Sequence, residues 1–295
     1  LLGLLLSCES GAKKQPAPEN LIKSVPLQDK DIDEASGIEA GIKNTGIFWI
    51  HNDSGDKPRI FAVDTAGKTI AEYRLEGIRK HWKDCEDIAS AVIDGKGFIF
   101  LADIGDNRAK RNSIFIYAFP EPEIAGNIKK VKGKIKDIEI FELHYPDGSR
   151  DAEAFFVDPQ TYDFYIVSKR DKKARLYKTS YPHSNGKIRT LIFLTELNLG
   201  SDENHEKQIT AADISSDGKK ILLKSYEKVF YFERKDGESV KKALLGSPVE
   251  MPYIMEPQGE ALCLSSDENG FCTLSEKRDM LSMPSIYFYK FTGMK

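Results

Sequence analysis

The stretch W-K-D-C-E-D-I-A-S-A-V-I-D-G-K-G-F-I-F-L-A-D-I-G-D-N, residues 82–107, decides the fold. Its alternating apolar residues predict a short strand, a glycine turn and a second strand. If the two strands form a hairpin, Asp84, Glu86 and Asp87 at the start of the first lie near Asp103 and Asp106 at the end of the second. The stretch therefore predicts a hairpin with carboxylates gathered at its open end.

The same pattern returns at four other places in the chain. The five copies are E-A-S-G-I from Glu34, D-C-E-D-I from Asp84, D-A-E-A-F from Asp151, T-A-A-D-I from Thr210 and Q-G-E-A-L from Gln258. A second apolar strand follows each copy, and its polar end comes 17 to 19 residues after the motif begins. Third and fourth strands then fill most of each period. Repeated four-stranded units of this length are typical of a β-propeller.

The sequence thus predicts an all-β chain that forms a β-propeller with five four-stranded blades. A six-bladed ring is the alternative, because the second and third periods are long enough to hold extra strands. The last unit has only three strands, and L-I-K-S-V-P-L at residues 21–27 can supply the fourth and close the ring. V-K-K-A-L-L-G at residues 240–246 is expected to form the outer strand of the fourth blade.

The expected organisation is one propeller domain over residues 21–295, preceded by a flexible tether over residues 9–20. Residues 1–8, L-L-G-L-L-L-S-C, are too short to span a bilayer, and Leu5-Leu6-Ser7-Cys8 resembles a bacterial lipobox. This predicts a signal-peptide remnant that ends at a lipidated Cys8. The protein is then a monomer in the bacterial cell envelope, at the outer membrane or cell surface, attached by its lipid alone. The net charge of -3 gives no support to nucleic-acid binding.

In a propeller, the start of each innermost strand and the end of the next strand lie on one face near the axis. Acidic and amide residues from all five repeats are therefore expected around one opening: Glu34, Asn52, Asp53, Asp84, Glu86, Asp87, Asp103, Asp106, Asn107, Asp151, Glu153, Asp213, Glu260 and Glu276. Lys169, Arg170 and Lys277 share that rim. For some of these residues the alternative is structural, since Asp and Asn often cap turns, and Asp87 and Asp213 could hold neighbouring blades together.

So many carboxylates at one opening repel one another unless protons or cations compensate. Oxygen ligands of this kind suit Ca²⁺ best, followed by Mg²⁺ or Mn²⁺. Zinc is disfavoured because the chain has no C-x-x-C motif and no His pair at ligand spacing. Cys263 is expected to face Cys272 across a hairpin, either as a disulfide or, as we favour, as two small buried apolar residues.

The motifs H-N-D-S-G (51–55), E-D-I-A (86–89), D-I-G-D-N (103–107), D-A-E-A (151–154) and Q-G-E-A (258–261) resemble those of exported bacterial propeller lipoproteins. More distantly, the E-A pair that opens an inner strand is similar to β-propeller phytases and phytase-like esterase domains, which are calcium-dependent. That resemblance implies metal ligands at Asp53, Glu86, Asp103, Glu153, Glu260 and Glu276. Asp106 is a further candidate ligand, because it is expected on the same rim. It implies phosphate contacts at Lys169, Arg170 and Lys277.

Two functions are consistent with these features. The first is a binding platform in which the acidic opening holds a divalent cation and the loops bind a small anionic ligand or an envelope partner. The alternative is a metal-dependent phosphoester or other ester hydrolase, in which Glu153 or Glu260 acts as general base and Lys169 and Arg170 hold the substrate anion. No G-x-S-x-G elbow or phosphate-binding glycine loop is present to suggest another chemistry.

Overall fold

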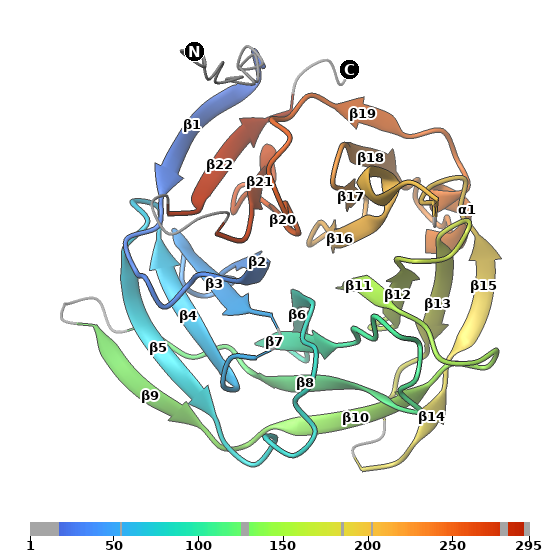
Figure 1. The fold of residues 1–295 in the computed structure, drawn as a ribbon, viewed down its shortest axis with the longest axis horizontal. Coiled ribbons are helices and arrows are strands. Elements are labelled where there is room, and N and C mark those ends of the chain that lie inside the picture. Colours follow the sequence, from blue (N-terminus) through green and yellow to red (C-terminus); the bar gives the residue numbers. More distant parts are fainter. Residues whose placement is uncertain are drawn as a thin grey trace, which may run out of the picture.

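Five β-sheets surround a central axis in the computed structural model, which describes residues 18–53, 55–124, 130–183, 186–201, 203–277 and 283–291 (Figure 1). Each sheet contains one blade of four antiparallel strands, which lie side by side in order from the axis outward, and two of the sheets carry a fifth strand at the outer edge. The predicted five-bladed β-propeller is confirmed. The predicted lipidation site Cys8 and most of the tether lie outside the described residues. No helix among the described residues is long and apolar enough to cross a bilayer.

The blades follow one another along the chain. Blade 1 contains β2 (Ala35–Ala40), β3 (Ile47–Asn52), β4 (Arg59–Asp64) and β5 (Thr69–Leu75). Blade 2 contains β6 (Asp87–Ile93), β7 (Lys96–Asp103), β8 (Ile114–Pro120) and β10 (Glu139–His144). Blade 3 contains β11 (Ala152–Val157), β12 (Phe164–Ser168), β13 (Arg175–Thr179) and β15 (Ile192–Glu196). Blade 4 contains β16 (Ile209–Ile214), β17 (Lys220–Ser225), β18 (Val229–Glu233) and β19 (Val249–Met251).

Blade 5 closes the ring with strands from both ends of the chain. It contains β20 (Ala261–Leu264), β21 (Gly270–Leu274), β22 (Ser285–Lys290) and β1 (Leu21–Pro26). Strand β1 pairs antiparallel with β22, from Leu21 opposite Tyr289 to Pro26 opposite Ser285. Both strands lie at the same side of the ring in Figure 1. The predicted closure by the segment at residues 21–27 is therefore confirmed.

The long second and third periods hold extra edge strands and not a sixth blade. Strand β9 (Val131–Ile135) pairs in parallel with β5 of blade 1, and β14 (Arg189–Thr190) pairs in parallel with β10 of blade 2. Each extra strand lies at the outer edge of a preceding blade (Figure 1). The spare residues thus cover exposed strand edges, which otherwise invite pairing with other chains.

The expected outer strand at residues 240–246 is wrong, because most of this segment is the short helix α1 (Val240–Leu244). The Ser239 side chain caps the helix by accepting from the backbone N–H of Lys242. Val240, Ala243 and Leu244 share its buried face at helical spacing. The outer strand of blade 4 is β19 instead, which follows the helix.

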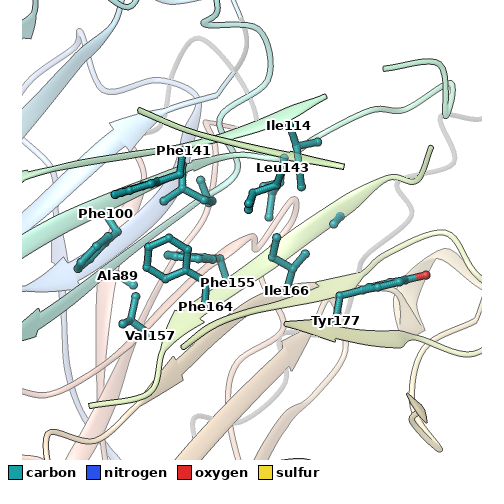
Figure 2. Packing of buried hydrophobic residues seen from close by; sticks show 14 of the residues in the cluster. Ala89, Phe100, Ile114, Phe141, Leu143, Phe155, Val157, Phe164, Ile166 and Tyr177 are labelled. Carbon is teal, nitrogen blue, oxygen red and sulfur yellow. The ribbon is translucent and has the colours of Figure 1, made fainter. Parts of the chain in front are cut away.

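Apolar side chains pack between neighbouring blades. Figure 2 shows the cluster between blades 2 and 3, where Phe164 of β12 lies among three other phenylalanine rings. Its ring centroid is 5.4 Å from that of Phe100, 5.5 Å from Phe141 and 5.6 Å from Phe155, all edge to face. Aromatic pairs favour this geometry. The packing fixes the blade-to-blade angle on which the position of the axial residues depends.

Two further sequence expectations concern buried residues. Cys263 lies opposite Cys272 in the β20–β21 pair, as predicted, and both are buried free thiols. Asp87 is fully buried inside the channel, where it accepts from the backbone N–H groups of Ile88, Phe155 and Ala212. It thereby joins the innermost strands of three blades, so the alternative structural role of Asp87 is the one observed.

Candidate metal centre

Three glutamates meet on the axis at one face of the ring. Glu86 comes directly before β6, Glu153 is the second residue of β11, and Glu260 comes directly before β20. The innermost strands all start at this face, so equivalent repeat positions point to one place. Each glutamate offers a carboxylate oxygen, and these oxygens lie within 4.8 Å of one another. All three residues are at least nine-tenths buried.

A second acidic group adjoins the first and shares Glu86 with it. Asp53, Asp84 and Glu86 offer carboxylate oxygens within 4.8 Å of one another, and the two aspartates are half-buried. Gly105 of the D-I-G-D-N motif allows this approach, because a Cβ at that position would collide with the carboxylates of Glu86 and Asp84. The glycine therefore belongs to the site and not only to a turn.

The buried ammonium group of Lys169 contacts these carboxylates directly. Lys169 Nζ is ion-paired with Glu153 Oε1, lies 3.5 Å from Glu260 Oε1 and donates to the Tyr226 hydroxyl at 2.9 Å. Tyr226 in turn donates to Glu260 Oε1. With all groups ionised, the three glutamates and Lys169 carry a formal charge of −2. One divalent cation would neutralise that charge.

Burial and mutual repulsion shape the titration of the cluster. Burial raises the pKa of Glu86 well above its ordinary value, and the carboxylates of Glu153 and Asp53 add to the shift. Burial also raises the pKa of Glu153, although Lys169 opposes it. For Lys169 burial lowers the pKa, but Glu153 and Glu260 outweigh it, so the net pKa is raised and the ammonium stays charged.

Glu153 has one oxygen that no protein group satisfies. Among the described residues, its Oε2 is buried and has no hydrogen-bond partner, while Oε1 is held by Lys169. A buried polar atom of this kind is costly unless a ligand, an ion or a water completes it. Together with the convergence of the three glutamates, this oxygen marks the cluster as one that could hold a cation.

Tyr226 also belongs to the site, but it was not predicted from the sequence. The fourth repeat was expected to begin at Thr210, which is two residues too late. Thr210 occupies the place of Glu153 in its blade, and each lies at a register shift in its strand pair. The repeat therefore begins at Gln208, and Tyr226 follows by 18 residues, as Lys169 follows Asp151 and Glu276 follows Gln258. The signal was available in the sequence as the constant interval.

The same shift makes the rim placement of Asp213 wrong. Asp213 lies in the second half of β16, nearer the opposite end of the channel, and accepts from the backbone N–H groups of Ile214 and Leu264. Leu264 belongs to blade 5, so the alternative role of Asp213 in joining neighbouring blades is observed.

Asp103 and Asp106 lie outside the two acidic groups. Asp103 is fully buried, accepts from the backbone N–H groups of Lys83 and Asp84, and is ion-paired with Arg111 at 2.7 Å. Asp106 accepts from the backbone N–H of Arg111. These contacts give both aspartates a role in shaping the loop beside the site.

The other predicted residues surround the centre. Glu276 is half-buried, and burial together with the Glu260 carboxylate raises its pKa to about 8. Arg170 is exposed and ion-paired with Asp151 at 2.6 Å. Lys169 is buried, so the cations expected to contact a phosphate do not form one open group. Lys277 is half-buried, and its backbone N–H donates to the Asp33 carbonyl.

A basic cavity of about 610 Å³ adjoins the acidic groups, and sequence reasoning did not find it. Its lining includes Lys80, Lys83, Arg108 and Lys110, all exposed and without an ion pair among the described residues. Asp84 lines the same cavity, and it also belongs to the acidic group with Asp53 and Glu86. A cation held there would thus lie beside a site for an anion.

The raised pKa values predict a pH effect on stability. Burial is the largest cause in raising the pKa of Asp213 and Glu256 to about 7 and that of Glu276 to about 8. Such groups bind protons more tightly in the folded chain, so their stabilising contribution is lost as the pH rises through the folded pKa. Metal-free protein should therefore melt at a lower temperature at about pH 8 than at about pH 7.

Thermal melts with a chelator present test this effect, and Glu276→Gln should make the pH dependence shallower. Added Ca²⁺ should do the same, because a cation takes the place of the bound protons. A melting temperature that is constant or rises between the two pH values would contradict the assignment.

Comparisons with known proteins add no assignment. Neither protein-family models nor curated proteins gave a match to this chain.

Proposed function

We propose that this protein is a β-propeller platform that holds one divalent cation at its axis and binds a small anionic ligand beside it. The observation that carries the proposal is the buried, unpartnered Oε2 of Glu153, within a group of three converging glutamates. A cation among Glu86, Glu153 and Glu260 would satisfy that oxygen and reduce the repulsion that raises the pKa of Glu86.

Calcium fits the donor set best. Ca²⁺ takes six to eight oxygen ligands in flexible geometry. The nearby side chains all offer oxygen: the carboxylates of Asp53, Asp84, Glu86, Glu153 and Glu260 and the hydroxyl of Tyr226. Asp53 and Asp84 can add ligands to those of the glutamates. Mg²⁺ demands a near-ideal octahedron and Mn²⁺ accepts the same donors, so both remain weaker candidates. The Lys169 ammonium brings the formal charge of the three glutamates to −2, which one divalent ion balances.

The ligand-binding face is the basic cavity next to the centre. Lys80, Lys83, Arg108 and Lys110 give it positive charge, and Asp84 connects it to the cation. Phosphate and carboxylate groups pair with such side chains and also coordinate Ca²⁺. An anionic ligand would therefore contact the cavity and the cation together.

Replacing Arg108 and Lys110 by alanine is expected to weaken binding of inorganic phosphate to the calcium-loaded protein by about tenfold or more. The expectation follows because each charge-assisted hydrogen bond contributes about 1.5–3 kcal/mol. Isothermal titration calorimetry measures the affinity. Lys134→Ala, an exposed lysine of β9 in blade 1, is the control and should leave it unchanged. Equal loss in both proteins, or no loss in either, would contradict the placement of the ligand.

The second candidate is a metal-dependent ester hydrolase, favoured by the position of Asp84 in both the acidic group and the basic cavity. A bound divalent cation would polarise the ester and lower the pKa of a water. Glu153 or Glu260 is the candidate general base, while the cavity cations hold the substrate. A panel of phosphate and carboxylate esters tests this candidate. Turnover that a chelator abolishes would support it, and an inert metal-loaded protein would reject it.

We further propose that the protein is a lipid-anchored component of the bacterial envelope, on the strength of Leu5-Leu6-Ser7-Cys8. Metabolic labelling with a tagged fatty acid should label the natural chain and not Cys8→Ser. Labelling that persists in the variant would count against this location.

A further inference from the structure

A second cavity, of about 490 Å³, lies at the end of the channel opposite the metal centre. It is lined by the last residues of all five innermost strands, including Ala40 of β2, Val92 of β6 and Val157 of β11. The metal centre lies at the first residues of the same strands. A strand of six residues spans about 20 Å, so the two sites are separate. The volume suits a small organic molecule.

The charged residues that line this cavity are all acidic. Among the described residues, its charged lining residues are Glu39, Asp213 and Glu268, and no Lys, Arg or His lines it. Glu268 lies 3.5 Å from Lys220 Nζ and also accepts from the backbone N–H of Ser216. Asp213 accepts from two backbone N–H groups. Two of the three carboxylates therefore have partners within the protein.

Within the described ranges, Glu39 has a partner for only one of its two oxygens. It is only 6% exposed, its Oε1 accepts from the Ser90 hydroxyl, and its Oε2 has no hydrogen-bond partner among the described residues. No cation is ion-paired with it in the described part of the chain. Burial and the nearby Asp213 carboxylate raise its pKa well above the ordinary value. When Glu39 is charged, no cation of the described residues compensates it, so a cationic ligand would stabilise the charged form.

We propose that this cavity binds a small molecule bearing a primary ammonium group, with Glu39 as its ionic partner. An ammonium group donates hydrogen bonds to a carboxylate, and Asp213 adds negative charge nearby. The apolar side chains of Ile42, Val92 and Pro159 in the lining would contact the hydrocarbon part of the ligand.

Two other kinds of cation fit the cavity less well. The described residues include no group of three metal-ligating side chains here, in contrast to the axial glutamates, which disfavours a metal ion. Quaternary ammonium ligands are usually held by aromatic rings, and no aromatic residue in the described part of the chain lines this cavity. The inference does not depend on the proposed function, because it concerns the other end of the channel.

Calorimetric titration of the folded protein with n-butylamine at about pH 8, where an alkylammonium is still charged, tests the proposal. The expected result is saturable binding with a 1:1 stoichiometry, and much weaker binding of 1-butanol, which matches the ligand in size but carries no charge. Glu39→Gln should weaken amine binding by about tenfold or more. Glu268→Gln, a carboxylate of the same cavity that already has partners, should change it by no more than about twofold.

A second variant locates the site without touching a carboxylate. Ile42 is 38% exposed and lines the cavity, so Ile42→Trp should fill the opening and block the amine while Glu39 stays in place. It also keeps the proposal testable if Glu39→Gln fails to fold. Absence of amine binding to the natural protein, equal binding of 1-butanol, or undiminished amine binding by Ile42→Trp would each overturn the proposal.

Discussion

Glu153→Gln is expected to weaken Ca²⁺ binding by at least about 100-fold, more than loss of an outer-shell group typically costs at a metal site. Glu153 is at the centre of the cluster, and only one of its two oxygens has a partner among the described residues. Oε1 is paired with Lys169, and Oε2 is the buried atom without a partner. Glutamine keeps the shape but removes the negative charge, so the ammonium of Lys169 is then less well compensated and repels an incoming cation.

Calorimetric titration with Ca²⁺ measures this loss, and Glu139→Gln is the matched control. Glu139 lies exposed on β10 at the outside of blade 2, so its loss should leave the affinity unchanged. Circular dichroism checks that the Glu153 variant keeps its β structure. Unaltered Ca²⁺ affinity in a folded Glu153→Gln protein would remove Glu153 from the site.

Asp87→Ala should lower the free energy of unfolding by about 3 kcal/mol or more. The Asp87 carboxylate accepts from Phe155 N at 2.8 Å, Ile88 N at 2.9 Å and Ala212 N at 3.3 Å. These N–H groups belong to innermost strands, which lie at the edge of their sheets and have no further strand to pair with there. Alanine leaves all three buried and unsatisfied, at about 1–3 kcal/mol each.

Urea denaturation with a chelator present measures the effect without the contribution of bound metal. Asp137→Ala, in an exposed loop before β10, should change the free energy of unfolding by less than about 0.5 kcal/mol. A loss at Asp87 no larger than at Asp137 would show that the blades do not depend on the buried carboxylate.

Much of the ring could be predicted from the sequence because its signals are local and repeated. Alternating apolar residues marked the inner strands, and the shortfall of one strand in the last unit indicated closure by Leu21–Pro26. The segment V-K-K-A-L-L gave no such guidance, because its apolar residues fit a strand or a single helical turn. The preceding Ser239, which caps the helix, could have decided between them.

The parallel edge strands β9 and β14 could not be predicted in the same way. Each joins a blade built from a distant part of the chain, so its partner is set by the assembled ring and not by neighbouring residues. β9, V-K-G-K-I, alternates like a strand, but nothing in its sequence identifies β5 as its partner, and β14 has only two residues.

The candidate site also contains residues that the repeat predicts and residues that only the folded structure brings together. Glu86, Glu153 and Glu260 could be placed together because they occupy one position in three repeats. The burial of Lys169 could not be predicted, because it depends on contacts with Tyr226 and Glu260 of other blades. The cavity beside Lys80 and Arg108 could not be predicted either, since the loops that carry these residues meet only after folding. The constant interval within the repeat predicts Tyr226 once the fourth repeat is aligned correctly. The alignment is difficult because Thr210 occupies the position at which three other repeats have glutamate.

Crystals soaked in Mn²⁺, a stand-in for Ca²⁺ with a strong anomalous signal, test the central claim most directly. The expected anomalous difference map has one strong peak within coordination distance of Glu86 and of Oε2 of Glu153, with Glu260 completing the protein ligands. Absence of a peak at this place in a crystal saturated with Mn²⁺, with Lys169 still paired to Glu153, would contradict the assignment of a metal centre.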